Sequence, residues 1–436
     1  MELPIPSSAD EYVLSGARLV NTLDGHITNH ASIHIKDGYI TSIVEGDNHT
    51  ESGLPVIDLK GKYVLPGLID CHVHLAAVPG RHGIAESLML SPSTSLLHQP
   101  LLCQAMLDRG FTSVRDCAGA TADLKQAIEE GVHAGPRLFI AGKALSQTGG
   151  HGDFRKRHEE MSGFCGCGSG SNSMIRIVDG VPDCLKYARE ELRRGADFIK
   201  IMSGGGVISP SDRIDQVQFS DEEIKAIVTV ATNARTYVTS HAYTPEAIQQ
   251  AISQGVRSIE HGNLLDDETA QLMVRSGVFL TPTLSAYDTL ARPKYSKLLP
   301  QYAVDKNQEV LDKGFQAIKI ASDAGVTLCF GSDLLGPMHE AQTLEFVLRS
   351  RVQKPLPILQ SATVNAARLI QQEKSLGHIA VGFLADMLIL NSNPLEDITI
   401  LAEPDHHLLA TIQGGRVVSS RWSRLQVKQH RLTQIE

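Results

Sequence analysis

The sequence has no continuous apolar run of about 18 residues, the length that a helix needs to cross a membrane, so we expect no membrane span. Its first residues, MELPIPSSAD, lack a basic segment followed by an apolar one, so we expect no secretory signal. Cysteine is sparse, with seven among 436 residues, and this odd number favours a reducing compartment over a disulfide framework. These absences together predict a cytoplasmic protein.

The sequence also lacks an excess of basic residues. Lys and Arg number 40 against 49 Asp and Glu, which gives a formal net charge of −9. A general binder of nucleic acid or of an anionic membrane needs a basic face, so we expect neither partner. Hydrophobic residues make up 42% of the chain and charged residues 20%, a composition that excludes bulk disorder and allows a large core.

Both ends of the chain are rich in short strands and turns. Residues 12–45 contain strand-like runs with turn signals at Asp24-Gly25 and Asp37-Gly38. Similar runs return after about residue 385. We therefore predict a small composite β-sandwich domain that is built from residues 1–62 and 376–436.

The middle of the chain, residues 63–375, alternates strand-like with helix-like segments. Many of the helix-like segments begin after Ser, Asp or Thr and end in Gly, as helix caps do. Eight strands in this alternation predict an α/β fold, a (β/α)8 TIM-like barrel, with a doubly wound open sheet as the alternative. No Gly-x-Gly-x-x-Gly motif opens a helix after the first strand, which weakens a dinucleotide-binding interpretation. The predicted strands are residues 63–75, 113–117, 137–142, 197–202, 237–242, 258–262, 279–284 and 327–333.

Ionisable side chains interrupt five of these apolar strands. His72 and His74 are two residues apart on the first strand, and because side chains alternate along a strand, both imidazoles point to one face. Such a pair alone is weak evidence, but packing does not explain ionisable residues in four further strands. We therefore predict a metal site at the C-terminal end of the barrel. The further residues are Lys200, His241, His261 and Asp333.

The stretch PGLIDCHVH at residues 66–74, with these later residues, resembles the metal-dependent amidohydrolase superfamily, and the likeness spans nearly the whole chain. Residues 144–153, 199–207, 240–244 and 259–263 resemble its Xaa-Pro dipeptidase-like and ochratoxinase-like branch. The resemblance implies two divalent ions, usually zinc. It implies that His72, His74 and Asp333 hold the more buried ion, that His241 and His261 hold the more exposed one, and that a carbamylated Lys200 bridges them.

Charge supports the modified lysine. Two dications would repel an ammonium strongly, whereas a carbamate offers an anionic oxygen to each metal. The alternative is a lysine that turns away or pairs with an acid such as Asp197. The same ligands accept Zn, Mn, Co or Fe, so the identity of the metal stays open.

The expected activity is amide or peptide hydrolysis by metal-bound hydroxide, with Asp333 delivering the proton to the leaving amine. The expected substrates are dipeptides or N-acyl amino acids, ochratoxin-type amides included. Two alternatives remain, a mononuclear cyclic-amide hydrolase or deaminase, against which Lys200 argues, and a non-catalytic barrel. The family resemblance also implies a homo-oligomer.

Substrate-binding residues are expected in the loops that follow the strands. Tyr243 can donate its hydroxyl to a substrate carboxylate or oxyanion, although a half-buried loop tyrosine explains it equally well. His151 is a candidate for orienting the substrate carbonyl, and Arg213 for clamping a carboxylate. Residues 146–180, and secondly 292–308, lack the regular alternation and are candidate lids.

Overall fold

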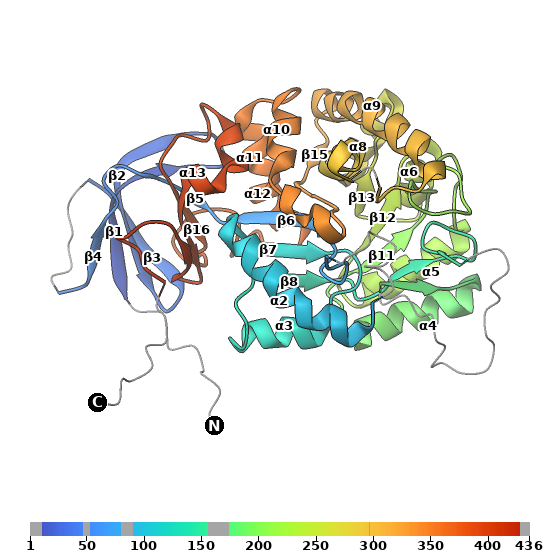
Figure 1. Ribbon diagram of the computed structural model, residues 1–436, viewed down its shortest axis with the longest axis horizontal. Helices are drawn as coiled ribbons and strands as arrows, with labels where there is room; N and C mark the ends of the chain where they lie inside the picture. The colour runs from blue at the N-terminus through green and yellow to red at the C-terminus, as the bar shows by residue number, and fades with distance from the viewer. Residues whose placement is uncertain (1–10, 47–52, 80–89, 156–173, 296, 428–436) are drawn as a thin grey trace.

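The computed structural model describes residues 11–46, 53–79, 90–155, 174–295 and 297–427. A β-rich lobe lies beside a larger unit of helices and parallel strands (Figure 1). Within the described residues, no helix combines the length and the apolar character that a membrane crossing requires.

Both ends of the chain contribute to one eight-stranded sheet in the β-rich lobe (Figure 1). The Asp37-Gly38 signal is a turn with positive φ at both residues, as the sequence predicts for a hairpin. From the first end come β1 (Tyr12–Val20), β2 (Ile27–Lys36), β3 (Tyr39–Glu45), β4 (Val56–Asp58) and β5 (Tyr63–Pro66). From the other end come β16 (Met387–Leu390), β17 (Leu408–Gln413) and β18 (Arg416–Ser420).

The single strand predicted over residues 63–75 is wrong, because the chain passes from one sheet to another at Gly67. Strand β5 pairs with β1 and β16 in the terminal sheet, whereas β6 (Leu68–Val73) pairs with β7 (Phe111–Asp116). A Cβ atom on Gly67 would lie 2.1 Å from the Thr112 hydroxyl, so only glycine allows this close approach.

The predicted alternation of strands and helices is confirmed in the α/β unit. Strand β7 pairs with β8 (Arg137–Ile140), and β9 (Ala144–Ser146) pairs with β11 (Ile199–Met202), always in parallel. From β11 onward, neighbouring strands follow chain order without the reversal that a doubly wound sheet requires. These later strands are β12 (Val238–Ala242), β13 (Ser258–His261), β14 (Phe279–Thr281) and β15 (Thr327–Leu328).

Backbone hydrogen bonds also bring the first and last of these strands side by side. The Cys71 amide in β6 donates to the Phe330 carbonyl beyond β15 at 2.8 Å, and the Asp333 amide donates to the His72 carbonyl at 2.8 Å. The C-terminal ends of the parallel strands consequently face one region.

Helices occupy the connections between the strands, with the caps that the sequence predicts. Ser220 and Glu223 form a capping box at the start of α5, and Gly277 ends α7 in the left-handed conformation. The main connecting helices are α2 (Pro92–Asp108), α3 (Ala122–Glu129), α4 (Gly180–Arg193), α5 (Asp221–Asn233), α6 (Pro245–Ser253), α7 (Asp267–Ser276), α8 (Leu284–Ala291) and α9 (Gln301–Ala324).

The two segments expected to be irregular contain regular structure. The first includes β10 (Ile175–Ile177) and the start of α4, and its residues 156–173 lie outside the described part. In the second, α9 begins at Gln301, so residues 301–308 are helical and not irregular.

Candidate active site

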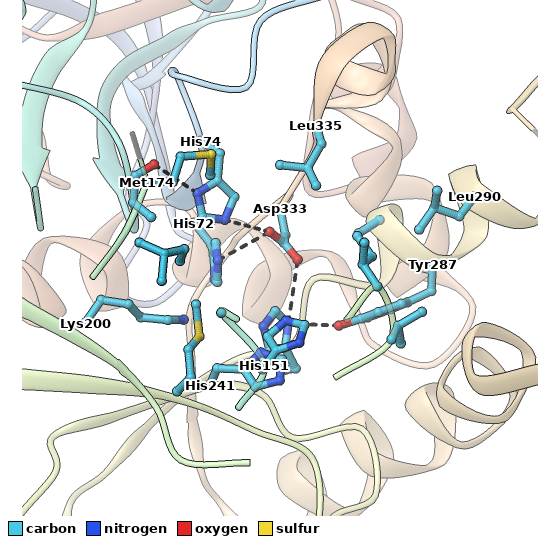
Figure 2. Close-up of a pocket in the computed structure, with 18 of the residues that line it drawn as sticks. His72, His74, His151, Met174, Lys200, His241, Tyr287, Leu290, Asp333 and Leu335 are labelled. Carbon is cyan, nitrogen blue, oxygen red and sulfur yellow. Dashed lines mark hydrogen bonds and ion pairs between the residues drawn. The ribbon is translucent and has the colours of Figure 1, made fainter. Parts of the chain in front are cut away.

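The six residues expected to bind metal all line one cavity at the C-terminal ends of the parallel strands (Figure 2). His72 lies in β6 and His74 directly follows this strand, while Lys200, His241 and His261 lie in β11, β12 and β13. Asp333 follows β15. The four histidines and Lys200 are buried, and the Asp333 side chain is 20% exposed.

His72, His74 and Asp333 form the tightest group. Oδ1 of Asp333 lies 3.0 Å from Nε2 of His74 and 3.4 Å from Nε2 of His72. One ligand atom from each residue falls within 4.8 Å of the others, a spacing that a single cation can bridge. The His261 ring is centred 5.1 Å from His72 and 4.5 Å from His241, so the two further histidines lie directly beside this group.

Burial favours the neutral form of three of these imidazoles, whereas at His74 the hydrogen bond to Asp333 and the charge of that carboxylate outweigh burial and raise the pKa. Burial lowers the pKa of His72 to about 4 and lowers the pKa values of His241 and His261 well below the usual range. Burial opposes ionisation of Asp333, but its interactions with His72 and His74 outweigh burial and hold the pKa of Asp333 at about 2. Neutral imidazoles and an ionised carboxylate are the forms that bind metals.

In the described part of the chain, Lys200 places an amine without a partner inside the cavity. Its Nζ is buried and has no hydrogen-bond partner among the described residues, and burial lowers its pKa. It does not pair with Asp197, which binds Lys125 at 2.7 Å instead. An orphaned amine beside four histidines and a carboxylate fits a site in which Lys200 faces bound cations.

Glu260 supports this site and is missed by the sequence analysis. It is fully buried, accepts a hydrogen bond from Nδ1 of His72 at 2.8 Å, and pairs with the buried Arg115 at 2.5 Å. The bond fixes the His72 ring so that Nε2 faces Asp333. The sequence feature that could have identified Glu260 is an acidic residue directly before His261 in an otherwise apolar strand.

Backbone strain marks the same strand ends. His261, Thr283 and Asp333 have φ values of 76°, 52° and 51°, in the left-handed region that residues with a side chain rarely adopt. Strain of this kind is costly and persists where the surrounding structure holds a functional side chain in place. His261 and Asp333 both line the cavity.

The predicted substrate-binding residues fall in two places. Tyr243 lines the cavity and its hydroxyl lies 2.7 Å from that of Tyr287, which in turn lies 2.9 Å from Nδ1 of His261. His151 also lines the cavity, and its ring stacks on His241 with centroids 4.2 Å apart. Arg213 does not line this cavity, because its largely exposed side chain pairs with Asp215 at 2.9 Å.

The rest of the cavity wall is apolar. Among its described lining residues, Asp333 is the sole carboxylate and Lys200 the sole amine, and no guanidinium is present. Leu290 and Leu335 lie across the cavity from Lys200 in Figure 2. The other large apolar lining residues include Phe154, Met174, Ile175, Met202 and Met338.

Several known proteins resemble this chain in sequence and fold. Residues 63–418 match the profile of the amidohydrolase family. The chain is 33% identical over 396 residues to the ochratoxinase of Aspergillus niger, with 87% of this chain and 81% of that protein covered. A prolidase complexed with N-methylphosphonate-L-proline superposes with a TM-score of 0.90 at 42% identity, over 94% of this chain and 100% of that one. A Xaa-Pro dipeptidase with methionine bound in its active site gives a TM-score of 0.83 at 29% identity, over 94% and 99% of the two chains.

Proposed function

The chain belongs to the amidohydrolase family, a metal-dependent family, and from this premise we propose that it hydrolyses an amide bond of dipeptides or N-acyl amino acids with two bound divalent ions. The observation that carries the proposal is the buried amine of Lys200, which has no hydrogen-bond partner among the described residues, in a cavity lined by five histidines and Asp333. The likeness to a prolidase and to an ochratoxinase supports amide substrates.

The proposed architecture is a (β/α)8 barrel with a composite β domain. The barrel would consist of β6, β7, β8 with β9, and β11 to β15, closed by the bond between Cys71 and Phe330. The second domain would combine residues 1–62 and 376–436. Because β5 pairs within the terminal sheet, we place the first boundary at Gly67 instead of residue 62.

His72, His74 and Asp333 would hold one ion, and His241 and His261 the other. Burial lowers the pKa of Lys200, which favours the neutral, nucleophilic form of the amine; its reaction with CO₂ would give a carbamate that could serve as a ligand to both ions. When bound, the two ions would supply Lewis-acid polarisation of the scissile carbonyl and would lower the pKa of a water molecule. Zinc is the expected metal for this mixture of imidazole and carboxylate ligands.

The chain's own residues carry the proton. Asp333 is ionised and its side chain reaches the cavity, so it can accept a proton from the attacking water and pass it to the leaving nitrogen. Tyr243 and His151 flank the same space and would orient the substrate. The apolar walls keep bulk water away from the reacting bond.

The cavity wall also indicates the class of substrate. A basic side chain of a substrate would lose its hydration in this cavity, and Asp333 is the only carboxylate among the described lining residues that could pair with it. An acidic side chain of a substrate would find no guanidinium among the same residues. Full burial of an apolar side chain is worth about 1.5–3 kcal/mol, which corresponds to roughly 10- to 100-fold in kcat/KM. We therefore propose substrates with apolar groups on both sides of the amide.

The test is a library of dipeptides and N-acyl amino acids assayed with zinc-loaded protein. Hydrolysis of Leu-, Met- or Phe-containing members at least about tenfold faster than Arg, Lys or Glu counterparts is expected. Asp333→Asn should abolish turnover, whereas Asp215→Asn, outside the cavity, should not. A library without any hydrolysed member contradicts the proposed reaction, and one metal per active chain would favour the mononuclear alternative.

The predicted homo-oligomer has one supporting feature. Helix α2 exposes Leu97 to 79% and Leu101 to 71%, one helical turn apart, which makes an apolar pair that a subunit interface would cover. Light scattering during size-exclusion chromatography measures the assembly, and Leu97→Lys with Leu101→Lys should dissociate it if this face is the interface.

A further inference from the structure

Two apolar walls of the cavity come from segments that lie far apart in the chain. Val207 and Ile208 belong to the loop between β11 and α5, residues 203–220. Tyr287 and Leu290 belong to α8 (Figure 2). Both walls pack into one apolar cluster with the first half of α9. The space between the walls therefore depends on how α9 is attached to each of them.

Lys306 and Tyr302 attach the loop to α9. Nζ of Lys306 donates to three backbone carbonyls of the loop, those of Asp212 at 2.7 Å, Gly206 at 3.0 Å and Ser209 at 3.2 Å. The Tyr302 hydroxyl donates to the carbonyl of Ile208 at 2.8 Å. Lys306 and Tyr302 are four positions apart, so they lie on the same face of the helix. One face of α9 therefore holds the backbone of the loop before, at and after Ile208.

The charge of Lys306 is matched inside the loop. Asp212 is 4% exposed, and its Oδ1 lies 3.8 Å from Nζ of Lys306. Its Oδ2 accepts hydrogen bonds from the Gly206 amide and from Nε2 of Gln218, each at 3.0 Å. Neither Lys306 nor Asp212 is among the described residues that line the cavity. Lys306 consequently acts on the cavity through the backbone of the loop and not by contact with a substrate.

The second wall is attached to the same helix. Asn307, next to Lys306, is 2% exposed, and its Nδ2 donates to the Tyr287 carbonyl at 3.0 Å. Leu284 of α8 packs into the same apolar cluster as Ala317 of α9. Adjacent residues of one helix thus hold the two walls, so a regular element sets the distance between them.

The loop can yield only away from the cavity. On the cavity side, a Cβ atom on Gly206 would stand 1.8 Å from Nδ1 of His151, so the backbone already lies in close contact with this ring. On the other side is an open pocket, whose lining residues include Arg213 and Asp215 of the loop and Glu309 and Lys313 of α9. Without its bonds to α9 the loop would therefore recede into that pocket, and the cavity would widen.

We propose that Lys306 and Tyr302 are positioning residues that determine the largest apolar group the site accepts, because they hold Val207 and Ile208 against the cavity. A group too large for a fixed wall is rejected, since overpacking is costly, whereas a wall that yields accommodates it. The effect on substrates rests on the proposed amide hydrolysis, but the attachment of the loop is a property of the protein alone.

Hydrogen exchange measures the attachment of the loop without any turnover. Mass spectrometry of substrate-free protein reports how fast the backbone amides of residues 203–220 exchange. Lys306→Met should speed this exchange about tenfold and Tyr302→Phe by a smaller factor, while the amides of β13 stay unchanged. Lys313→Met is the matched control, because it makes the same substitution on the same helix at an exposed lysine that pairs with Glu309 at 2.9 Å. It should leave the exchange unchanged.

The ratio of two activities measures the selectivity. For a library substrate, kcat/KM of its naphthylalanine analogue divided by that of its leucine analogue should rise about tenfold in Lys306→Met. Ile208→Ala removes the wall side chain itself and should change the ratio in the same direction. For the leucine analogue KM should rise more than kcat falls, since Lys306 does not touch the reacting bond.

The outcomes separate positioning from general damage. Circular dichroism verifies that each variant folds, and Tyr302→Phe, which keeps the aromatic ring, serves for both measurements if Lys306→Met does not fold. Equal loss of activity toward both analogues, or unchanged exchange of residues 203–220 in the folded α9 variants, overturns the proposal. If no library member is hydrolysed, the proposed function fails, and the exchange rates still decide whether α9 holds the loop.

Discussion

Glu260→Gln is the substitution whose consequences follow most directly from the structure. Glu260 and Arg115 are both 0% exposed, with Oε1 and Nη2 2.5 Å apart, and the other carboxylate oxygen accepts the hydrogen of His72. A glutamine keeps the shape but removes the charge, which leaves the Arg115 guanidinium buried without a counterion. Breaking a buried ion pair in this way costs about 3–5 kcal/mol.

The same substitution acts on the metal site through His72. Groups that orient a ligand histidine typically contribute 10- to 100-fold to metal affinity, so the zinc affinity should fall by about that factor. Urea unfolding of the metal-free protein measures the first effect, and competition with a chromogenic chelator measures the second. Both should change, because one carboxylate bonds the guanidinium and the imidazole.

Glu190→Gln is the control for this experiment. Glu190 pairs with Arg193 and Arg194 on the surface of α4, where solvent screens the charges, so the unfolding midpoint should not move. The reasoning is refuted if Glu260→Gln unfolds at the same urea concentration as the unaltered protein, or if zinc affinity is unchanged while the protein is destabilised.

Three further changes test other parts of the structure. Lys200→Ala should lower the metal content, measured by elemental analysis, from two ions per chain to one or none. The control is Lys313→Ala, which removes an exposed lysine on α9 and should leave the metal content unchanged. Equal metal content in both variants contradicts the bridging role of Lys200. Burial raises the pKa of Glu345 from 4.5 to about 7, so between these values the folded state holds a proton that the unfolded state releases. The free energy of unfolding should therefore fall by about 3 kcal/mol as the pH rises from 4.5 to 7. Glu345→Gln should remove this contribution, whereas the buried Asp70 and Asp116, with pKa values of about 6, keep theirs. A slope equal to that of the unaltered protein in urea unfolding across this pH range counts against the reasoning. Gly206→Ala should displace the His151 ring and lower kcat/KM by about 100-fold, and undiminished turnover would show that this ring position is dispensable.

Local patterns explain why much of the α/β unit can be predicted. The caps at Ser220 and Gly277 depend on residues a few positions apart, and the structure contains a strand within each of the eight predicted segments. Residue spacing on one strand likewise predicts that His72 and His74 share a face. The prediction fails at residues 63–75, since the chain passes between two sheets at Gly67. Gly67 packs there against Thr112 from another strand, a contact that no local pattern reveals.

The sequence by itself determined which ionisable side chains lie in or directly after the parallel strands. It could do so because strand periodicity and the order of βαβ units depend on residues that are close together in the chain. The tertiary structure alone decided what surrounds these side chains. Arg115 meets Glu260 across 145 positions of the chain, and Lys306 reaches Gly206 across 100. It also decided that Arg213 faces solvent and that the Lys200 amine has no hydrogen-bond partner within the described part of the chain. Burial, charge pairing and the placement of a proton depend on neighbours that folding brings together.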